Sequence, residues 1–80
     1  MKSRKVYVRV IAEIDEQGSI CPKSLTWEDG RQFIIDKVTA IQRACAAKTG
    51  GTAIRYSINV EGKQTYLYED DGKWFVESRI

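Results

Sequence analysis

The sequence predicts an all-β fold, a small antiparallel SH3-like or partly open barrel of about five or six strands. Polar and apolar residues alternate over several short segments, and many of the apolar ones are β-branched or aromatic. Alternation of this kind is typical of half-buried strands. Glycine-containing turn sequences separate the segments, and the chain contains only one proline. Because 80 residues rarely hold more than one domain, residues 1–80 are expected to form a single small β domain.

The alternation is clearest in residues 5–15. One face of this expected strand carries Val6, Val8, Val10, Ala12 and Ile14, and the other carries Lys5, Tyr7, Arg9, Glu13 and Asp15. Ile11 is the only aliphatic residue on the second face. We therefore expect one long strand with its first set of side chains in the core.

The next segment, residues 25–35, reads as a hairpin around Asp29-Gly30. A two-residue loop would place Trp27 and Phe33 on opposite faces of the hairpin. A three-residue loop, Glu28-Asp29-Gly30, places both on one face, together with Leu25 and Ile35. Gly30 then stands where such a loop needs a left-handed backbone, so the sequence favours the three-residue loop.

Residues 36–49 are ambiguous. Their alanines, and a stripe formed by Val38, Ile41 and Cys45, favour a helix by local propensity. An α+β fold, with one helix at 36–49 on an antiparallel sheet, is therefore the alternative. Residues 53–61, 64–69 and 73–77 return to strand-like sequences, and we expect them to form a meander with turns at Gly62-Lys63 and at Asp70-Asp71-Gly72.

A wider pattern resembles a group of small uncharacterised bacterial proteins. These share a proline before a Trp-x-x-Gly-Arg-x-aromatic hairpin, and here the matching residues are Pro22, Trp27, Gly30, Arg31 and Phe33. Gly50-Gly51, Arg55-Tyr56 and the C-terminal Trp74-Phe75-Val76-Glu77 are similar too. The resemblance implies a small antiparallel barrel in which residues 36–48 are extended and Gly50-Gly51 forms a hairpin turn. It implies no function and no site residues.

The composition argues against most chemistry. The chain has no histidine, so it lacks the commonest general base and metal ligand. Cys21 and Cys45 have no motif partners and are expected to be reduced, inert thiols. We therefore predict no catalytic residues, no metal and no cofactor. Without a signal peptide or a long apolar run, a cytoplasmic protein that does not enter membranes is expected.

Basic residues mixed with aromatic ones are the remaining feature. Lys5, Tyr7 and Arg9 share one face of the first strand. Tyr66 and Tyr68 stand outside, near Arg55, if the preceding loop has two residues, and they enter the core if it has three. Glycine at the first loop position favours the former, and the aromatic content favours burying at least one ring. These six residues are the candidate binding residues.

The function predicted is therefore a non-enzymatic small β module that acts by surface binding. Small barrels that bind single-stranded nucleic acids combine a basic groove with stacking aromatic rings, so nucleic acid is the favoured partner. The net charge of +2 does not by itself require one. The alternative is a protein-interaction or self-associating domain, including a homodimer, that uses a strand edge or an aromatic patch.

Overall fold

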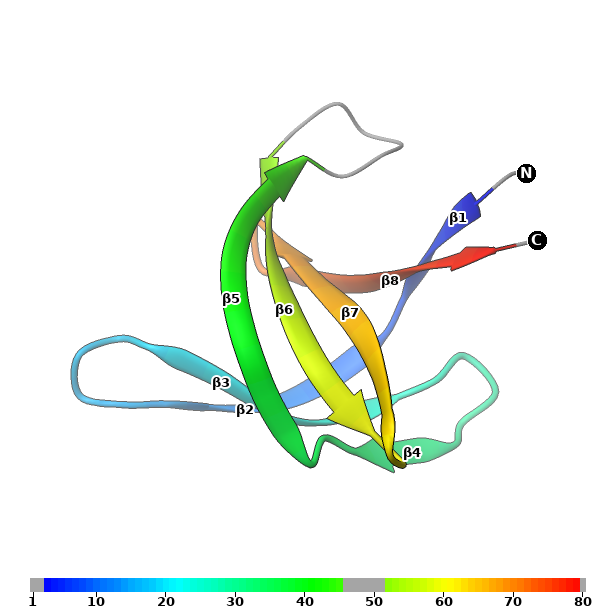
Figure 1. Ribbon diagram of the computed structural model, residues 1–80, viewed down its shortest axis with the longest axis horizontal. Coiled ribbons are helices and arrows are strands. Elements are labelled where there is room, and N and C mark those ends of the chain that lie inside the picture. The colour runs from blue at the N-terminus through cyan, green and yellow to red at the C-terminus, as the bar shows by residue number, and fades with distance from the viewer. Residues whose placement is uncertain (1–2, 46–51, 80) are drawn as a thin grey trace.

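The computed structural model describes residues 3–45 and 52–79, which form eight strands in two antiparallel sheets (Figure 1). The strands are β1 (Ser3–Tyr7), β2 (Arg9–Ile14), β3 (Ile20–Thr26), β4 (Gln32–Ile34), β5 (Lys37–Cys45), β6 (Thr52–Val60), β7 (Lys63–Asp70) and β8 (Lys73–Arg79). The first sheet has the order β1-β8-β7-β6-β5, and the second has the order β2-β3-β4.

The expected single strand over residues 5–15 is two strands, because the chain leaves the first sheet for the second at Val8. The Val8 amide still donates to the Trp74 carbonyl at 3.0 Å, whereas Arg9 already pairs with Thr26. Val6 is buried and Val10 half-buried, as expected. Ala12 and Ile14 are exposed, contrary to expectation. They lie on the β2–β3 hairpin, which projects away from the rest of the molecule like an arm (Figure 1).

The predicted register of the β3–β4 hairpin is confirmed. Leu25 pairs with Phe33, and the loop is Glu28-Asp29-Gly30. The Trp27 amide donates to the Arg31 carbonyl at 2.8 Å, and the Gly30 amide donates to the Trp27 carbonyl at 2.9 Å. Gly30 has a φ of +92°, the conformation that a type I turn followed by a left-handed residue requires.

The helix considered for residues 36–49 is wrong over the described part of that segment. Residues 37–45 form strand β5, which pairs with β6 from Lys37–Asn59 to Cys45–Thr52. The eight residue pairs that β5 forms with β6 outweigh a helix preference that amounts to a fraction of a kcal/mol per residue. Residues 46–51, including the expected Gly50-Gly51 turn, lie outside the described residues.

The β6–β7 turn has two residues, as favoured, but it lies one position earlier than expected. Val60 pairs with Lys63, so the loop is Glu61-Gly62 instead of Gly62-Lys63. Both loop residues have positive φ, 52° and 77°, as in a type I′ turn. The shift leaves the facing of the side chains unchanged. Leu67 points into the core, and Tyr66 and Tyr68 point to the opposite face.

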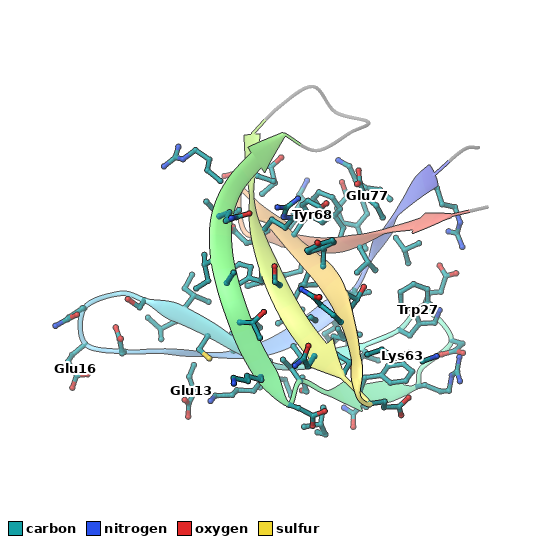
Figure 2. All side chains as sticks on the ribbon, in the orientation of Figure 1. Glu13, Glu16, Trp27, Lys63, Tyr68 and Glu77 are labelled. Atoms are coloured by element: carbon teal, nitrogen blue, oxygen red, sulfur yellow. The ribbon has the colours of Figure 1, made fainter. Side chains whose placement is uncertain are left out.

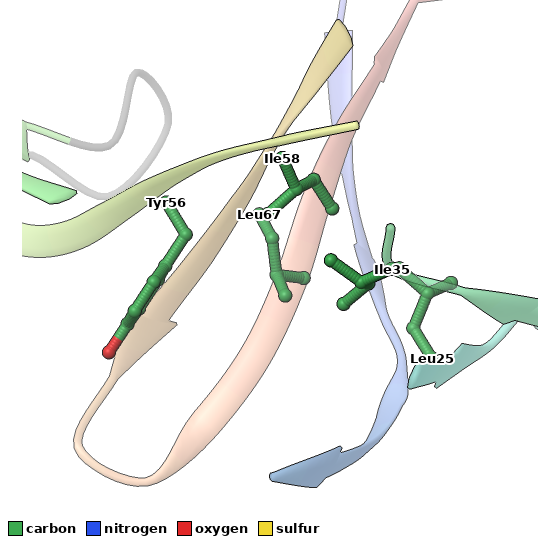
Figure 3. Packing of buried hydrophobic residues seen from close by; sticks show 5 residues of the cluster. All are labelled: Leu25, Ile35, Tyr56, Ile58 and Leu67. Carbon is green, nitrogen blue, oxygen red and sulfur yellow. The ribbon is translucent and has the colours of Figure 1, made fainter. Parts of the chain in front are cut away.

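The core lies between the two sheets. Leu25 and Ile35 come from the three-stranded side and meet Tyr56, Ile58 and Leu67 from the five-stranded sheet (Figure 3). Over residues 3–45 and 52–79 the all-β class is therefore confirmed, with eight strands instead of five or six, and the two sheets of this part of the chain do not close into a barrel. A closer likeness to SH3 barrels stays a prediction.

Candidate binding site on the outer face of the five-stranded sheet

Five of the six predicted binding residues share one surface, the face of the five-stranded sheet that points away from the core. We call it the outer face. Paired residues of neighbouring strands share a face, and the register links them across four strands. The pairs are Lys5–Glu77, Tyr7–Phe75, Phe75–Tyr68, Tyr68–Arg55 and Tyr66–Ser57. Arg9 does not join them, because it belongs to β2 in the other sheet.

Three aromatic rings form a continuous row across β1, β8 and β7. The Tyr7 and Phe75 rings meet edge to face, with centroids 5.7 Å apart. Phe75 and Tyr68 stack almost parallel, with centroids 5.2 Å apart and planes 8° apart. Both geometries are favourable for aromatic pairs. Phe75 and Tyr68 are buried, so the row is a rigid base and only its Tyr7 end is open.

Tyr7 and Tyr66 are the exposed rings of the outer face. Tyr7 is 55% exposed and Tyr66 is 43% exposed, whereas Tyr68 is only 8% exposed. The sequence left open whether both tyrosines lie outside or both enter the core, and neither alternative holds for the pair. Tyr66 is at the surface. Tyr68 is buried, although its side chain points away from the main core. Phe75 and Ala53 complete this smaller cluster.

Each exposed tyrosine carries a neighbouring cation. Lys5 Nζ lies 5.7 Å from the centroid of the Tyr7 ring and 4.6 Å from that of Phe75. The guanidinium carbon of Arg55 lies 4.6 Å from the centroid of the Tyr66 ring. A cation within about 6 Å of an aromatic face is attracted to the ring. The two exposed rings and the two cations are therefore held as pairs.

Arg55 is fixed further by its neighbours in the sheet. Its Nη2 donates a hydrogen bond of 2.6 Å to Oε1 of Gln42 on β5. Its Nε is buried, and no described residue accepts a hydrogen bond from it. Holding the guanidinium in one place reduces the side-chain entropy that it would lose on binding an anion.

Tyr68 supplies packing and a neutral hydroxyl. Burial raises the pKa of Tyr68, and the nearby Glu77 carboxylate raises it further, while Arg55 opposes both effects. The register places Tyr68 of β7 and Glu77 of β8, both labelled in Figure 2, on the outer face. Because the phenol stays protonated near neutral pH, Tyr68 adds no charge to the outer face.

Sequence reasoning did not assign Phe75, Gln42 or Glu77 to the binding surface. The structure has the two-residue loop Asp71-Gly72 in place of the expected turn Asp70-Asp71-Gly72, and this loop places Phe75 opposite Tyr68. Strand alternation could have revealed Phe75 only with that shorter loop. Gln42 could not be found, since its segment was ambiguous between helix and strand.

Arg31 and the two cysteines were also named from the sequence. Arg31 pairs with Asp29 at 2.8 Å, and Glu28 pairs with Arg4 at 3.0 Å. Cys21 is a free, half-buried thiol, and the side chain of Cys45 lies outside the described part of the chain.

Within residues 3–45 and 52–79, no three metal-ligating side chains come together. In the same residues no helix has the length and apolar character needed to cross a membrane.

The comparisons with known proteins give no further assignment. No family model matches the chain, and neither a curated protein nor a solved structure is significantly similar to it. The resemblance to small bacterial proteins therefore stays a prediction, and the function is argued from the geometry of the outer face.

Proposed function

We propose that the protein is a non-enzymatic binding module whose outer face binds single-stranded nucleic acid. The observation that carries this proposal is the pairing of two exposed tyrosines, Tyr7 and Tyr66, with the cations Lys5 and Arg55. Proteins that bind single strands stack bases on aromatic side chains and contact the phosphates with Lys or Arg. Both kinds of group stand here on one rigid sheet.

The charge of the outer face supports weak, salt-sensitive binding. Besides Lys5 and Arg55, the register places the exposed Lys37 and Lys73 on this face, and the acidic residues there are Asp70 and Glu77. The excess of positive charge is small, so binding depends on stacking as well as on phosphate contacts. Affinity that rests partly on phosphate contacts falls as salt rises.

A titration of fluorescently labelled single-stranded oligonucleotides, followed by anisotropy at several salt concentrations, tests the proposal. We expect binding at low salt that weakens steadily as salt is added. Tyr7→Ala and Tyr66→Ala should each weaken it, since one stacked base contributes about 1–3 kcal/mol. Tyr→Phe at either position keeps the ring and should bind nearly as well as the unchanged protein.

The chain offers a matched control for the charges. Lys5→Ala removes a cation from the outer face, and Arg9→Ala removes one from the neighbouring strand β2, outside it. We expect Lys5→Ala to lower the slope of log affinity against log salt by about one, and Arg9→Ala to leave the slope unchanged. Absence of binding at low salt, or equal effects of the two substitutions, would contradict the proposal.

Self-association is a second candidate, favoured by the exposed isoleucines of the projecting arm and of β5. Ile14 is 69% exposed and Ile41 is 57% exposed, and both line a cavity of about 540 Å³ between the arm and β5. Exposed apolar groups beside an open strand edge suit a second copy of the chain. Sedimentation over a range of protein concentrations tests self-association. A protein that is monomeric at every concentration would exclude this function.

A cytoplasmic location accords with the free thiol of Cys21, because reduced thiols persist in that compartment.

A further inference from the structure

The space between the two sheets opens at the end that contains the β6–β7 turn. On the core-facing side of β7, Leu67 is completely buried, whereas Thr65 and Lys63 are exposed. The register fixes the facing of the two exposed residues. Thr65 pairs with Ile58 of the core, and Lys63 pairs with Val60, which packs against the same core. The core therefore ends in an opening, and two polar side chains of β7 lie at its mouth.

This opening is a cavity of about 370 Å³ with a mainly apolar lining. A cavity of this volume can hold a small molecule. The apolar lining comes from both sides of the core and consists of Leu25, Trp27, Phe33, Val60 and Val76. All of these except Leu25 are only half-buried. A bound apolar group would therefore remove further apolar surface from water, which favours binding.

Three ionisable side chains border the cavity, and they are Glu61, Lys63 and Glu77. Glu77 has a partner of its own, since its carboxylate interacts with Tyr68 on the outer face. It is therefore not counted among the charges of the cavity. The Lys63 ammonium forms no ion pair or hydrogen bond with any described residue. Lys63 is thus a cation at the mouth of an apolar cavity, available to an anionic group of a ligand.

A second cavity, between the arm and β5, differs in its charges. Lys23 belongs to its lining but already pairs with Glu13, at a distance of 3.4 Å. Asp15 adds a further negative charge. A ligand carboxylate meets an unpaired cation only in the cavity beside Lys63, when these two cavities are compared, so charge favours that one.

We propose that the cavity beside Lys63 binds a small monocarboxylic acid with an apolar body, such as a medium-chain fatty acid or an arylalkanoic acid. The apolar body lies against Trp27, Phe33 and Val76, and the carboxylate pairs with the Lys63 ammonium at the mouth. Figure 2 labels Trp27 and Lys63, which border the cavity from opposite sides of the core. The hydroxyl of Thr65 supplies a further hydrogen-bond donor. The site is independent of nucleic-acid binding, which uses the opposite face of the five-stranded sheet.

Two neighbouring substitutions should change the affinity in opposite directions. Lys63→Met keeps an unbranched side chain but removes the charge that attracts a carboxylate. Glu61→Gln removes a negative charge that borders the same cavity and repels it. We expect Lys63→Met to weaken and Glu61→Gln to strengthen the binding of the acid, each by about twofold to fivefold, as is usual for exposed charges. Both residues are exposed, so both variants should fold.

The probe is octanoate, added to isotope-labelled protein and followed by NMR of the methyl groups and by tryptophan fluorescence. We expect the methyl signals of Leu25 and Val76 to shift and the emission of Trp27 to change. The methyl signals of Ile14 and Ile41, in the other cavity, should stay unchanged. Octylamine has the same chain and the opposite charge, and it should bind at least about fivefold more weakly. A parallel titration with 3-phenylpropanoate shows whether the cavity prefers an aliphatic or an aromatic acid.

Three results would overturn the proposal. The first is that neither acid binds. The second is that octanoate and octylamine bind equally well, or that Lys63→Met binds octanoate as tightly as the unchanged protein does, because the carboxylate would then have no partner at Lys63. The third is that octanoate shifts the signals of Ile14 and Ile41 as much as that of Val76, which would indicate general binding to apolar surface.

Discussion

Gly30 determines which side chains of the β3–β4 hairpin reach the core. Its positive φ allows a three-residue loop, and that loop puts Leu25 and Phe33 opposite one another on the same face. A two-residue loop would have sent Phe33 to solvent, because a one-residue slip reverses the facing of a whole strand. This inference was available from the sequence, since turn residues and alternation both pointed to the same loop.

The substitution Gly30→Val tests this loop conformation. No atom lies within 4 Å of the position that a Cβ would take at Gly30, so the cost is backbone strain alone. A β-branched residue at φ +92° should lower the free energy of unfolding by about 1–3 kcal/mol. Urea denaturation measures this. Gly30→Asn is the control and should lose less, because asparagine tolerates positive φ. A Gly30→Val variant as stable as the unchanged protein would show that the loop conformation is different.

Elements whose character depends on distant partners were the hardest to predict. Residues 37–45 read locally as a helix, and they are a strand because eight of them pair with the antiparallel edge of β6. The break between β1 and β2 has no sequence signal at all. It arises because Tyr7 pairs with β8 and Arg9 with β3, two strands that the alternation of residues 5–15 cannot distinguish.

The turn between β6 and β7 can be tested by a substitution at Glu61. Glu61 has a φ of 52°, which is unfavourable for glutamate, and Gly62 follows it at 77°. Asn-Gly is the preferred sequence for such a type I′ turn. We expect Glu61→Asn to raise the free energy of unfolding by about 0.5 kcal/mol or more, seen as a higher melting temperature.

Glu61→Ala is the matched control for that turn. It removes the same carboxylate but gains no preference for positive φ, so it should not stabilise the protein. If both variants are stabilised equally, the loss of charge is the cause and the turn assignment has no support.

The stability of the whole molecule depends mainly on the thin core between the two sheets. Leu67 is completely buried and contributes to the cluster that contains Leu25 and Ile58 (Figure 3). We expect Leu67→Ala to cost about 2–5 kcal/mol, a large share of the stability of so small a domain. Ile34→Ala, at a position 67% exposed, should change stability by less than about 0.5 kcal/mol. Denaturant unfolding of the two variants compares them directly, and equal losses would contradict this placement of the core.

The outer face was only partly predictable from the sequence. The strand parity of Lys5 and Tyr7, and that of Tyr66 and Tyr68, could be argued from alternation and turn length. Their assembly on one surface could not, because it depends on β8 lying between β1 and β7. The placement of Arg9 was missed for a related reason: it follows the point at which the chain changes sheets.

Chemical-shift mapping with an unlabelled single-stranded oligonucleotide at low salt tests the central claim most directly. We predict shifts concentrated at Lys5, Tyr7, Arg55 and Tyr66, which disappear when salt is raised. The signals of Arg9 and of β4 should stay where they are, since both belong to the other sheet. Binding whose shifts fall on the three-stranded sheet, or no shift at any salt concentration, would contradict the claim that the outer face is a nucleic-acid-binding surface.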